Sequence, residues 1–439
     1  QFEGAWTSDN SIEAGKVRLE RLGYFKEVNV ETIPVPGTED QIDIVYSVEE
    51  ETTGSVGGNI GYSDFGLMLG FNLQEQNFLG SGNTVGIGIN KNIYSEMYNI
   101  SYMNPYATRD AVSLGYNIFF RETDYGEFNV ANYLTNSNGF GAQFGYPISD
   151  ISRLGFNITY DKTDIDIGTL PAREIYDFVS VEGNIFETLT AQLSWQQVTL
   201  NRGLFPTDGA STVVSFSSTI PGSDLSYYRF NIRQRYYQPL SSDFVFGFQG
   251  EIGYLDSYGD TEEIPFFQNF YAGGPRSLRG FESNTLGPRS TDAPCYEFNY
   301  EEGTCPNLID TDGDGELDAP YLNPYANQGQ RSRYRDAPIG GNIKVEGSLQ
   351  LIFRLPFIED QRSLRSAFFF DFGNVFSDNC KEYQINCSEL SVDELRYSYG
   401  VGVTWITGFG PMSLAIAKPT NAGPLERTEE FQFTVGNVF

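Results

Sequence analysis

Beyond Thr53, hydrophobic and polar positions alternate with a period of two, in short runs separated by turn residues. In one such run Phe156 and Ile158 share a face, and Asn157 and Thr159 share the opposite face. This alternation is typical of strands whose two faces meet different surroundings. The pattern therefore predicts a large sheet that is apolar on one side and polar on the other.

A second run indicates what each face of the sheet contacts. Tyr228 and Phe230 alternate with Arg229, and Arg233 and Arg235 continue the arginine face. An arginine that faces lipid costs about 2–4 kcal/mol at the membrane midplane, so a row of three is excluded from that position. We infer that the arginine face lines an aqueous lumen and that the apolar face contacts lipid.

Counting these runs gives sixteen strands, an even number, as single-chain bacterial barrels require. The sequence thus predicts an all-β membrane protein, a 16-stranded antiparallel transmembrane β-barrel. The predicted strands are 54–63, 66–77, 82–92, 95–104, 110–121, 138–147, 152–163, 188–200, 210–220, 225–238, 243–257, 341–355, 363–376, 396–406, 411–418 and 429–439.

The links between these strands fall into two groups. One set is short and rich in turn residues, such as Asn104-Pro105-Tyr106 and Gln238-Pro239-Leu240. The long links, which would all lie at the other end of the barrel, are 122–137, 164–187, 258–340 and 377–395. Short periplasmic turns and long extracellular loops are typical of outer-membrane barrels. The pattern predicts that the long links are extracellular.

The first fifty residues follow a different pattern. Residues 11–22 predict a helix, and residues 26–33 and 41–48 predict two strands. One helix and two strands do not close a core alone. We therefore expect residues 1–50 to be the C-terminal part of a small periplasmic α/β domain, and residues 51–439 to form the barrel.

Composition narrows the possible functions. The formal charge of −30 argues against nucleic-acid binding, which needs a basic surface. The chain contains no histidine, which removes histidine-based catalytic triads and histidine metal ligands. It also has no Walker-type phosphate loop, because Gly15-Lys16 is followed by Val17. We expect a protein without catalytic residues or a required cofactor.

The four cysteines form two closely spaced pairs, Cys295 with Cys305 and Cys380 with Cys387. Four cysteines allow three connectivities, of which local pairing is favoured by the spacing. Disulfides in both pairs would indicate an oxidising compartment, and both pairs fall in predicted extracellular links.

One acidic segment of the long link 258–340 resembles the first part of a calcium loop. Asp310, Asp312 and Asp314 occupy positions one, three and five, with Gly315 at position six, and the acidic side chains continue with Glu316 and Asp318. Alternating hard oxygens around a sharp turn suit Ca²⁺. Position twelve is Tyr321 instead of the bidentate glutamate, so we expect a structural calcium ion, with a merely acidic loop tip as the alternative.

The same link contains residues that carry a family resemblance. Arg279-Gly280-Phe281 resembles the Arg-Gly-Phe motif of the BamA outer-membrane assembly family. Residues 76–82 (QNFLGSG) resemble the first periplasmic turn of that family, and the final residues, which end at Phe439, resemble its last strand. Residues 1–50 resemble the end of its final POTRA domain. The resemblance thus covers essentially the whole chain.

The resemblance implies that the extracellular loop folds back into the lumen and that Arg279 pairs with an acid on the inner wall. Asp371 stands at the family's position for one such acid. Where the family has a glutamate in the strand after the loop, this chain has Gln350, which we expect to accept a second, neutral hydrogen bond from Arg279. In this prediction Arg279, Gly280, Phe281, Asp371 and Gln350 together lock the loop to the barrel.

For function, the resemblance implies a non-enzymatic insertase. Its clients would be unfolded outer-membrane β-barrel proteins, received with the help of periplasmic accessory lipoproteins and passed to the outer-membrane lipid through a lateral seam between the first and last strands. The glycines at the two strands would weaken this seam, since glycine in a strand loses packing and entropy. The predicted seam residues are Gly54, Gly57, Gly58, Gly61, Gly436 and Phe439.

Three other functions stay open at this point. A secretion or translocation pore of the same superfamily is the nearest alternative. A passive porin is a second, against which the POTRA-like N-terminus and the plugging loop argue. An outer-membrane hydrolase is a third, and the histidine it would ordinarily use is missing.

Overall fold

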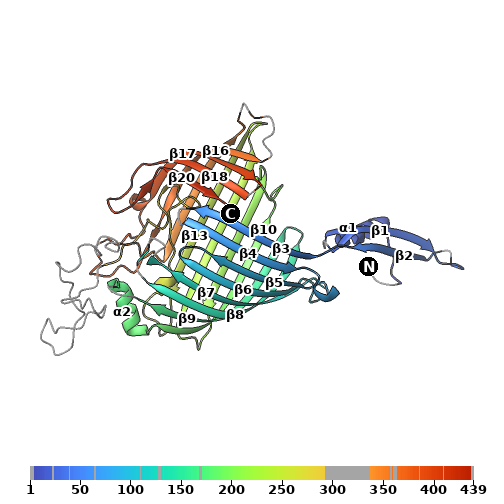
Figure 1. The fold of residues 1–439 in the computed structure, drawn as a ribbon, viewed down its shortest axis with the longest axis horizontal. Helices are drawn as coiled ribbons and strands as arrows, with labels where there is room; N and C mark the ends of the chain where they lie inside the picture. Colours follow the sequence, from blue (N-terminus) through green and yellow to red (C-terminus); the bar gives the residue numbers. More distant parts are fainter. Residues whose placement is uncertain are drawn as a thin grey trace.

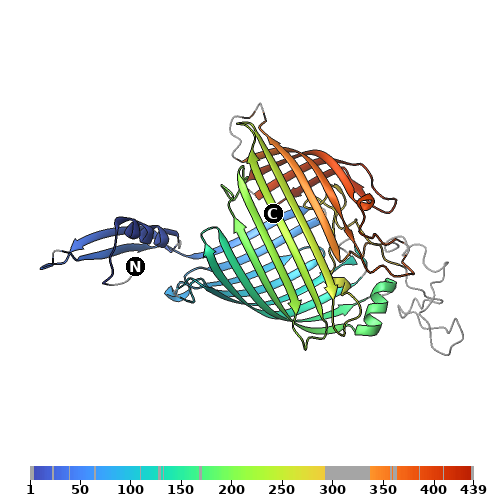
Figure 2. The same cartoon turned by 180° about the vertical axis from the view of Figure 1, so that it is seen from behind.

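A computed structural model describes residues 4–21, 24–38, 40–63, 66–108, 110–126, 130–131, 133–167, 171–291, 337–355, 358, 363–384, 386–408 and 410–436. It shows one large barrel with a small N-terminal unit projecting from one end (Figure 1). The reverse view shows the same arrangement, with helix α2 at the end of the barrel opposite the N-terminal unit (Figure 2).

The barrel is a closed sheet of sixteen strands in which all neighbours pair antiparallel. This confirms the predicted fold class. In chain order the strands are β3 (Gly54–Ser63), β4 (Gly66–Glu75), β5 (Thr84–Lys91), β6 (Ser95–Asn104), β7 (Ser113–Asp124), β8 (Leu134–Ser149), β9 (Ser152–Asp166), β10 (Ile185–Val198), β11 (Gly209–Thr219), β12 (Tyr227–Pro239), β13 (Phe244–Ser257), β15 (Ile343–Phe353), β16 (Leu364–Phe376), β17 (Arg396–Thr407), β18 (Gly410–Pro419) and β20 (Phe431–Val435).

The two faces of the wall carry the residues that the alternation predicts. Ile252 is 52% exposed on the outer face, where lipid would cover it. On the luminal face Arg233 pairs with Glu251 at 3.0 Å, and Lys344 lies 3.3 Å from the same carboxylate. Charged side chains are retained inside because they pair with each other in the lumen, while apolar side chains cover the exterior.

The N-terminal unit consists of α1 (Asp9–Arg21) and the antiparallel pair β1 (Phe25–Pro34) and β2 (Ile42–Glu50). Tyr24 connects this unit to the barrel. Its hydroxyl donates to the Gly82 carbonyl at 2.8 Å, and its own carbonyl accepts from the Glu51 amide at 2.9 Å. The first turn of the barrel on this side, which contains η1 (Phe78–Gly80), is thereby attached to the N-terminal unit.

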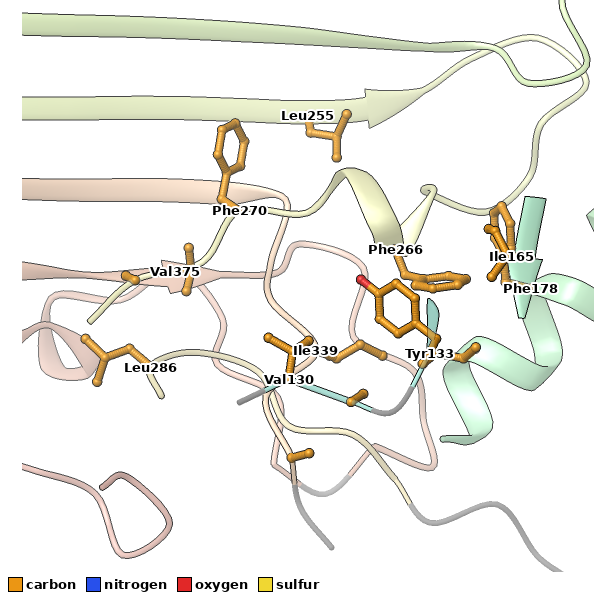
Figure 3. Close-up of a cluster of buried hydrophobic side chains, with 14 of the residues drawn as sticks. Val130, Tyr133, Ile165, Phe178, Leu255, Phe266, Phe270, Leu286, Ile339 and Val375 are labelled. Atoms are coloured by element: carbon orange, nitrogen blue, oxygen red, sulfur yellow. The ribbon is translucent and has the colours of Figure 1, made fainter. Parts of the chain in front are cut away.

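The opposite end of the barrel is closed by an apolar cap that the strand pattern did not predict. The cap includes Val130, Tyr133, Ile165, Phe178, Leu255, Phe266, Phe270, Leu286, Ile339 and Val375, all less than one-tenth exposed (Figure 3). Phe266 lies in η3 (Phe266–Gln268) and packs edge-on against both Tyr133 and Phe178. Side chains from several distant links thus form one core above the lumen.

Two further short helices lie at this end of the barrel among the described residues. They are α2 (Arg173–Glu182) and η4 (Val392–Glu394). Helix α2 falls within the link 164–187, where the sequence pattern predicts no helix, and it buries Ile175 and Phe178 against the cap. In the part of the chain that the structure describes, no helix is long and apolar enough to cross a membrane.

Candidate functional site

The link that follows β13 turns inward through the apolar cap and reaches the luminal wall. We call its residues 270–291 the luminal loop. Gly280 lies within this loop at φ +90°, and a Cβ atom there would meet the Ala417 side chain of β18 at 3.1 Å. Glycine is therefore needed both for the backbone conformation and for the close approach to the wall.

Arg279 and Asp371 form a two-pronged ion pair at the base of the luminal loop. The Arg279 Nε and Nη2 groups each donate to one Asp371 oxygen at 2.7 Å, and the Arg279 backbone amide donates to Oδ2 at 3.2 Å. The Asp371 side chain is fully buried, and the Arg279 side chain is 16% exposed. Paired planar groups of this kind are strong and geometrically specific. The contact predicted between these two residues is present.

Two neighbours on the wall complete the surroundings of Arg279. Its Nη2 also donates to Ser348 Oγ at 2.9 Å, and its guanidinium carbon lies 3.5 Å from the centre of the Phe369 ring. A cation over an aromatic face adds attraction, particularly where water is excluded. Sequence reasoning missed both residues, although alternation from Asp371 places Phe369 on the same inward face.

The expected hydrogen bond between Arg279 and Gln350 is wrong. Gln350 donates instead to Ser348 Oγ at 3.3 Å. The register explains the difference, because Ser348 stands directly opposite Asp371 whereas Gln350 stands opposite Phe369. A shift of two residues along the strand moves a side chain by about 7 Å while keeping it on the same face.

A second contact, also missed from the sequence, fixes the luminal loop to the wall. Ser277 donates to a Glu346 oxygen at 2.5 Å, and Lys344 lies 3.1 Å from the other Glu346 oxygen. Phe281, the last residue of the motif, is fully buried in the apolar cap. The loop is therefore held by an ion pair, a hydroxyl–carboxylate bond and an apolar anchor.

Among the residues that the structure describes, the seam between the first and last barrel strands is the weakest junction in the wall. β20 and β3 share a single registered pair, Val435 with Tyr62, whereas β3 and β4 are registered over ten pairs, from Gly54↔Glu75 to Ser63↔Gly66. Backbone groups along most of the two facing edges therefore have no partner across the seam among the described residues.

Two of the predicted seam glycines meet at this junction. Gly436 has φ +95°, and a Cβ atom there would lie 2.7 Å from the Gly61 Cα. A Cβ atom on Gly61 would lie 2.9 Å from the Val435 carbonyl oxygen. Both positions therefore allow the two backbones to approach where side chains would separate them.

The other predicted seam glycines make no such approach. A Cβ atom on Gly57 would have no neighbour within 4 Å, one on Gly58 would reach only a backbone oxygen at 3.9 Å, and one on Gly54 would meet the Glu75 side chain. Phe439 lies outside the described residues.

Behind the seam lies a luminal cavity of about 220 Å³. Its lining includes Ser63 and Thr434 from the two seam strands, Ser277 from the luminal loop, and Lys344 from the wall. Thr434 is 2% exposed, and its hydroxyl has no hydrogen-bond partner among the described residues. The cavity places the seam, the loop and the charged wall around one space.

The remaining predicted sites divide into two groups. The disulfide between Cys380 and Cys387 is present, with Cα atoms 5.9 Å apart. The Cys295–Cys305 pair and the calcium segment with Asp310, Asp312, Asp314, Glu316 and Asp318 lie outside the described residues. Among the described residues, no three cysteine or acidic side chains are grouped so that they could hold a metal ion.

A comparison with family models decides the family. The Omp85 superfamily domain matches residues 77–439, which include all but two of the sixteen barrel strands. The chain belongs to the Omp85 superfamily. A POTRA model, described as a surface antigen variable number repeat, matches residues 1–51. The Omp85 domain is thus preceded by a POTRA segment, as the family resemblance implied.

Relatives within the superfamily support the same placement. The chain is 29% identical over its whole length to the outer membrane protein assembly factor BamA of Neisseria meningitidis serogroup B, and covers 54% of that protein. It is 24% identical to the human sorting and assembly machinery component 50 homolog, and the aligned region covers 88% of this chain and 73% of that protein. The chain therefore spans about half the length of its bacterial relative.

A solved structure gives the matching fold. The crystal structure of BamA from Haemophilus ducreyi lacking POTRA domains 1–3 superposes with a TM-score of 0.80 at 29% identity, over 99% of this chain and 80% of that one. The resemblance to BamA drawn from Arg279-Gly280-Phe281 is thereby confirmed. The Omp85 barrel lies in the outer membrane of a Gram-negative bacterium, with the POTRA end in the periplasm and the apolar cap outside.

Proposed function

We propose that this chain is the barrel end of a non-enzymatic insertase that folds outer-membrane β-barrel proteins and inserts them into the lipid bilayer. The observation that carries the proposal is the seam, where the described parts of β3 and β20 share one registered pair, Val435 with Tyr62. An edge with unpaired backbone groups is a template for another strand, and a client strand can complete it by β-augmentation.

The outer surface at the seam supports this proposal. Val56 and Ile60 on β3 are 71% and 68% exposed, and Phe431 on β20 is 60% exposed. These side chains face lipid with little cover from a neighbouring strand. A client strand that adds at this edge would bury them while its own apolar face enters the membrane.

The partners follow from the same arrangement. Unfolded barrel precursors are the proposed clients, and outer-membrane lipid is the medium into which they pass. The POTRA segment would meet the precursors in the periplasm together with accessory lipoproteins. No cofactor or fuel is required in this proposal, because the folding of a client barrel is itself favourable.

The luminal loop and the apolar cap bear on the two alternative functions, a passive porin and a secretion or translocation pore. A passive porin needs an open aqueous channel, whereas the luminal loop occupies the lumen and the cap covers its outer end. A secretion or translocation pore of the same superfamily would have to displace both. Steady conductance across a planar bilayer would favour either pore over the insertase.

The test is reconstitution into liposomes, followed by measurement of the folding rate of a client barrel with and without a closed seam. Tyr62→Cys with Val435→Cys joins the two strands at their registered pair. Leu414→Cys with Phe433→Cys is the matched control, because it joins β18 and β20, which are already paired there. We expect the first crosslink to stop client folding and the second to leave it unchanged. Full activity with a verified Tyr62–Val435 crosslink would rule out lateral opening.

A further inference from the structure

We propose that Gln432 is a positioning residue that couples the Arg279 anchor of the luminal loop to the seam strand β20. This inference rests on the proposed insertase function for its biological meaning, but its physical content is a coupling between two sites in the barrel. Arg279 holds the luminal loop to Asp371 of β16, and Gln432 of β20 holds the same loop through Phe281.

The Gln432 amide contacts the luminal loop at two adjacent residues. Its Oε1 accepts from the Gly280 amide at 3.3 Å, and its Nε2 donates to the Phe281 carbonyl at 2.8 Å. The residue is 2% exposed. A buried amide that loses such partners leaves polar groups unsatisfied, which is costly, so Gln432 favours the arrangement that keeps the loop in place.

A short ladder reinforces this contact just before β20. The two-residue strand β14 (Gly280–Phe281) pairs with β19 (Thr428–Glu429). Next to this ladder, the Glu282 amide donates to the Arg427 carbonyl at 3.0 Å. The Arg427 amide in turn donates to Thr285 Oγ1 at 2.9 Å. The chain entering β20 is therefore held by the luminal loop over several consecutive residues.

The two anchors are adjacent in the sequence but bind different strands of the wall. Arg279 binds β16 and Gly280 binds β20, which are separated by β17 and β18 in the barrel order. Consecutive Cα atoms are only 3.8 Å apart, so a shift at one residue is passed to the next. The luminal loop thus forms a bridge between β16 and β20 on the luminal side of the wall.

This bridge matters because β20 has little other support on its seam side. Over its described residues it shares one pair with β3 and five pairs, Met412↔Val435 to Ile416↔Phe431, with β18. Loss of the Arg279–Asp371 pair would free the loop and let β20 move. Coupling between two sites is reciprocal, so displacement of β20 by a client would in turn loosen the loop.

The chain provides a matched control on the same strand and face. Thr434 is as buried as Gln432, but its hydroxyl has no partner among the described residues. Thr434→Val removes a hydroxyl without removing a hydrogen bond in this structure. Gln432→Met keeps the length of the side chain but loses both hydrogen bonds to the luminal loop and a longer one, at 3.5 Å, to Glu429. Gln432→Leu provides a second variant should one fail to fold.

The experiment measures the seam directly. Spin labels introduced through non-natural amino acids at the lipid-facing positions Ile60 and Phe431 report the distance across the seam in nanodiscs. We expect Gln432→Met and Arg279→Ala each to shift the closed-to-open ratio by roughly tenfold, as the loss of one or two buried hydrogen bonds would. The double variant should be no more open than either single variant, and Thr434→Val should match the unmodified protein.

Two results would overturn the coupling. One is an unchanged distance distribution in both folded Gln432 variants, and the other is additive opening by Gln432→Met and Arg279→Ala. Client folding by the unmodified protein in liposomes is measured in parallel. If the unmodified protein does not accelerate client folding, the proposed function fails while the distance data still decide the coupling. If it does accelerate folding and the Gln432 variants leave the distances unchanged, only the coupling fails.

Discussion

Both carboxylate oxygens of Asp371 accept hydrogen bonds at 2.7 Å from Arg279, a residue 92 positions earlier in the chain. The carboxylate is fully buried, so the charge of each residue depends on the other for compensation. This pair is the point at which the luminal loop is fixed to the wall, and it gives the first prediction.

Arg279→Ala or Asp371→Ala should each destabilise the seated loop by about 3–5 kcal/mol, because either change leaves a buried charge unpaired. The double variant should be no worse than either single variant. Arg279→Lys should restore only part of the loss, since an ammonium group lacks the two-pronged geometry. Hydrogen exchange of the loop amides measures the effect, and additive losses in the double variant would contradict the assignment.

The seam glycines give a second prediction. Gly61→Ala should separate the seam backbones and cost about 1–3 kcal/mol, the usual range for overpacking, because a Cβ atom there meets the Val435 carbonyl oxygen at 2.9 Å. Gly57→Ala on the same strand is the control, since a Cβ atom there has no neighbour within 4 Å. The spin-label distance between residues 60 and 431 measures both. Equal effects of the two changes would show that close packing at Gly61 is not needed.

A third prediction concerns pH and the extracellular helix α2. Both Glu174 oxygens accept from the Thr291 amide, at 3.0 and 3.1 Å. Burial raises the pKa of Glu174 above its ordinary value of 4.5, an effect larger than the opposing effect of these hydrogen bonds. A raised pKa means that the docked helix binds a proton more tightly than the undocked one.

The docking of α2 should therefore be strongest below the ordinary pKa of Glu174 and should weaken as the pH rises through its raised value. Glu174→Gln keeps an acceptor for Thr291 and should remove this pH dependence. The pH dependence of docking is measured by the hydrogen-exchange protection of the Thr291 amide, corrected for the intrinsic exchange rate at each pH. Glu389→Gln, at an exposed position of a neighbouring extracellular link, is the control. A flat pH profile in the unmodified protein would refute the prediction.

Peptide mapping without reductant should recover Cys295 linked to Cys305 and Cys380 linked to Cys387. Cys380→Ser with Cys387→Ser should loosen the contacts between the link 377–395 and Arg289. The Arg289 amide donates to the Asn386 carbonyl of this link at 2.9 Å. In the loop-entropy model, closing a ring of this size stabilises by roughly 2–3 kcal/mol. A cross-linked peptide from the two different loops would show that the local pairing is incorrect.

The acidic segment of the link 258–340 gives a prediction about calcium. The segment Asp310–Asp318 should bind Ca²⁺ with a Kd between about 10⁻⁴ and 10⁻³ M, the range of extracellular modules, because its twelfth position lacks a bidentate glutamate. Titration calorimetry of the whole chain measures this. Asp312→Asn with Asp314→Asn should abolish the binding heat, and an unmodified chain with no binding heat would leave only an acidic loop tip.

The barrel could be predicted closely from the sequence because lipid and lumen impose a period of two on every strand. β3 and β6 begin and end at the predicted residues, and the other strands differ by a few residues at their ends. The luminal position of Asp371 followed from the same alternation. Helix α2 was missed because its pattern is short, with ten residues, and its apolar positions only become informative once the cap they bury against is known.

The register between neighbouring strands could not be predicted from the sequence. Alternation assigns Ser348 and Gln350 to the same face but does not say which one stands beside Asp371. The role of Gln432 was equally hidden, because it depends on where the last strand passes the luminal loop. Family resemblance supplied Arg279 and Asp371, whereas their neighbours Ser348, Phe369 and Ser277 required the packed structure.

The ladder between Gly280–Phe281 and Thr428–Glu429 also has a consequence for the order of folding. Gly280 of the loop and its anchor Gln432 are 152 positions apart in the chain, so the loop is fully seated only when the last strand has reached its place. Contacts between such distant segments form slowly, because loop-closure entropy opposes them. A chain truncated before Thr428 would retain Arg279 and Asp371 but lose both the ladder and the closing strand. Correct seating of the luminal loop is thus a late folding step, because it requires that the last strand is already in place.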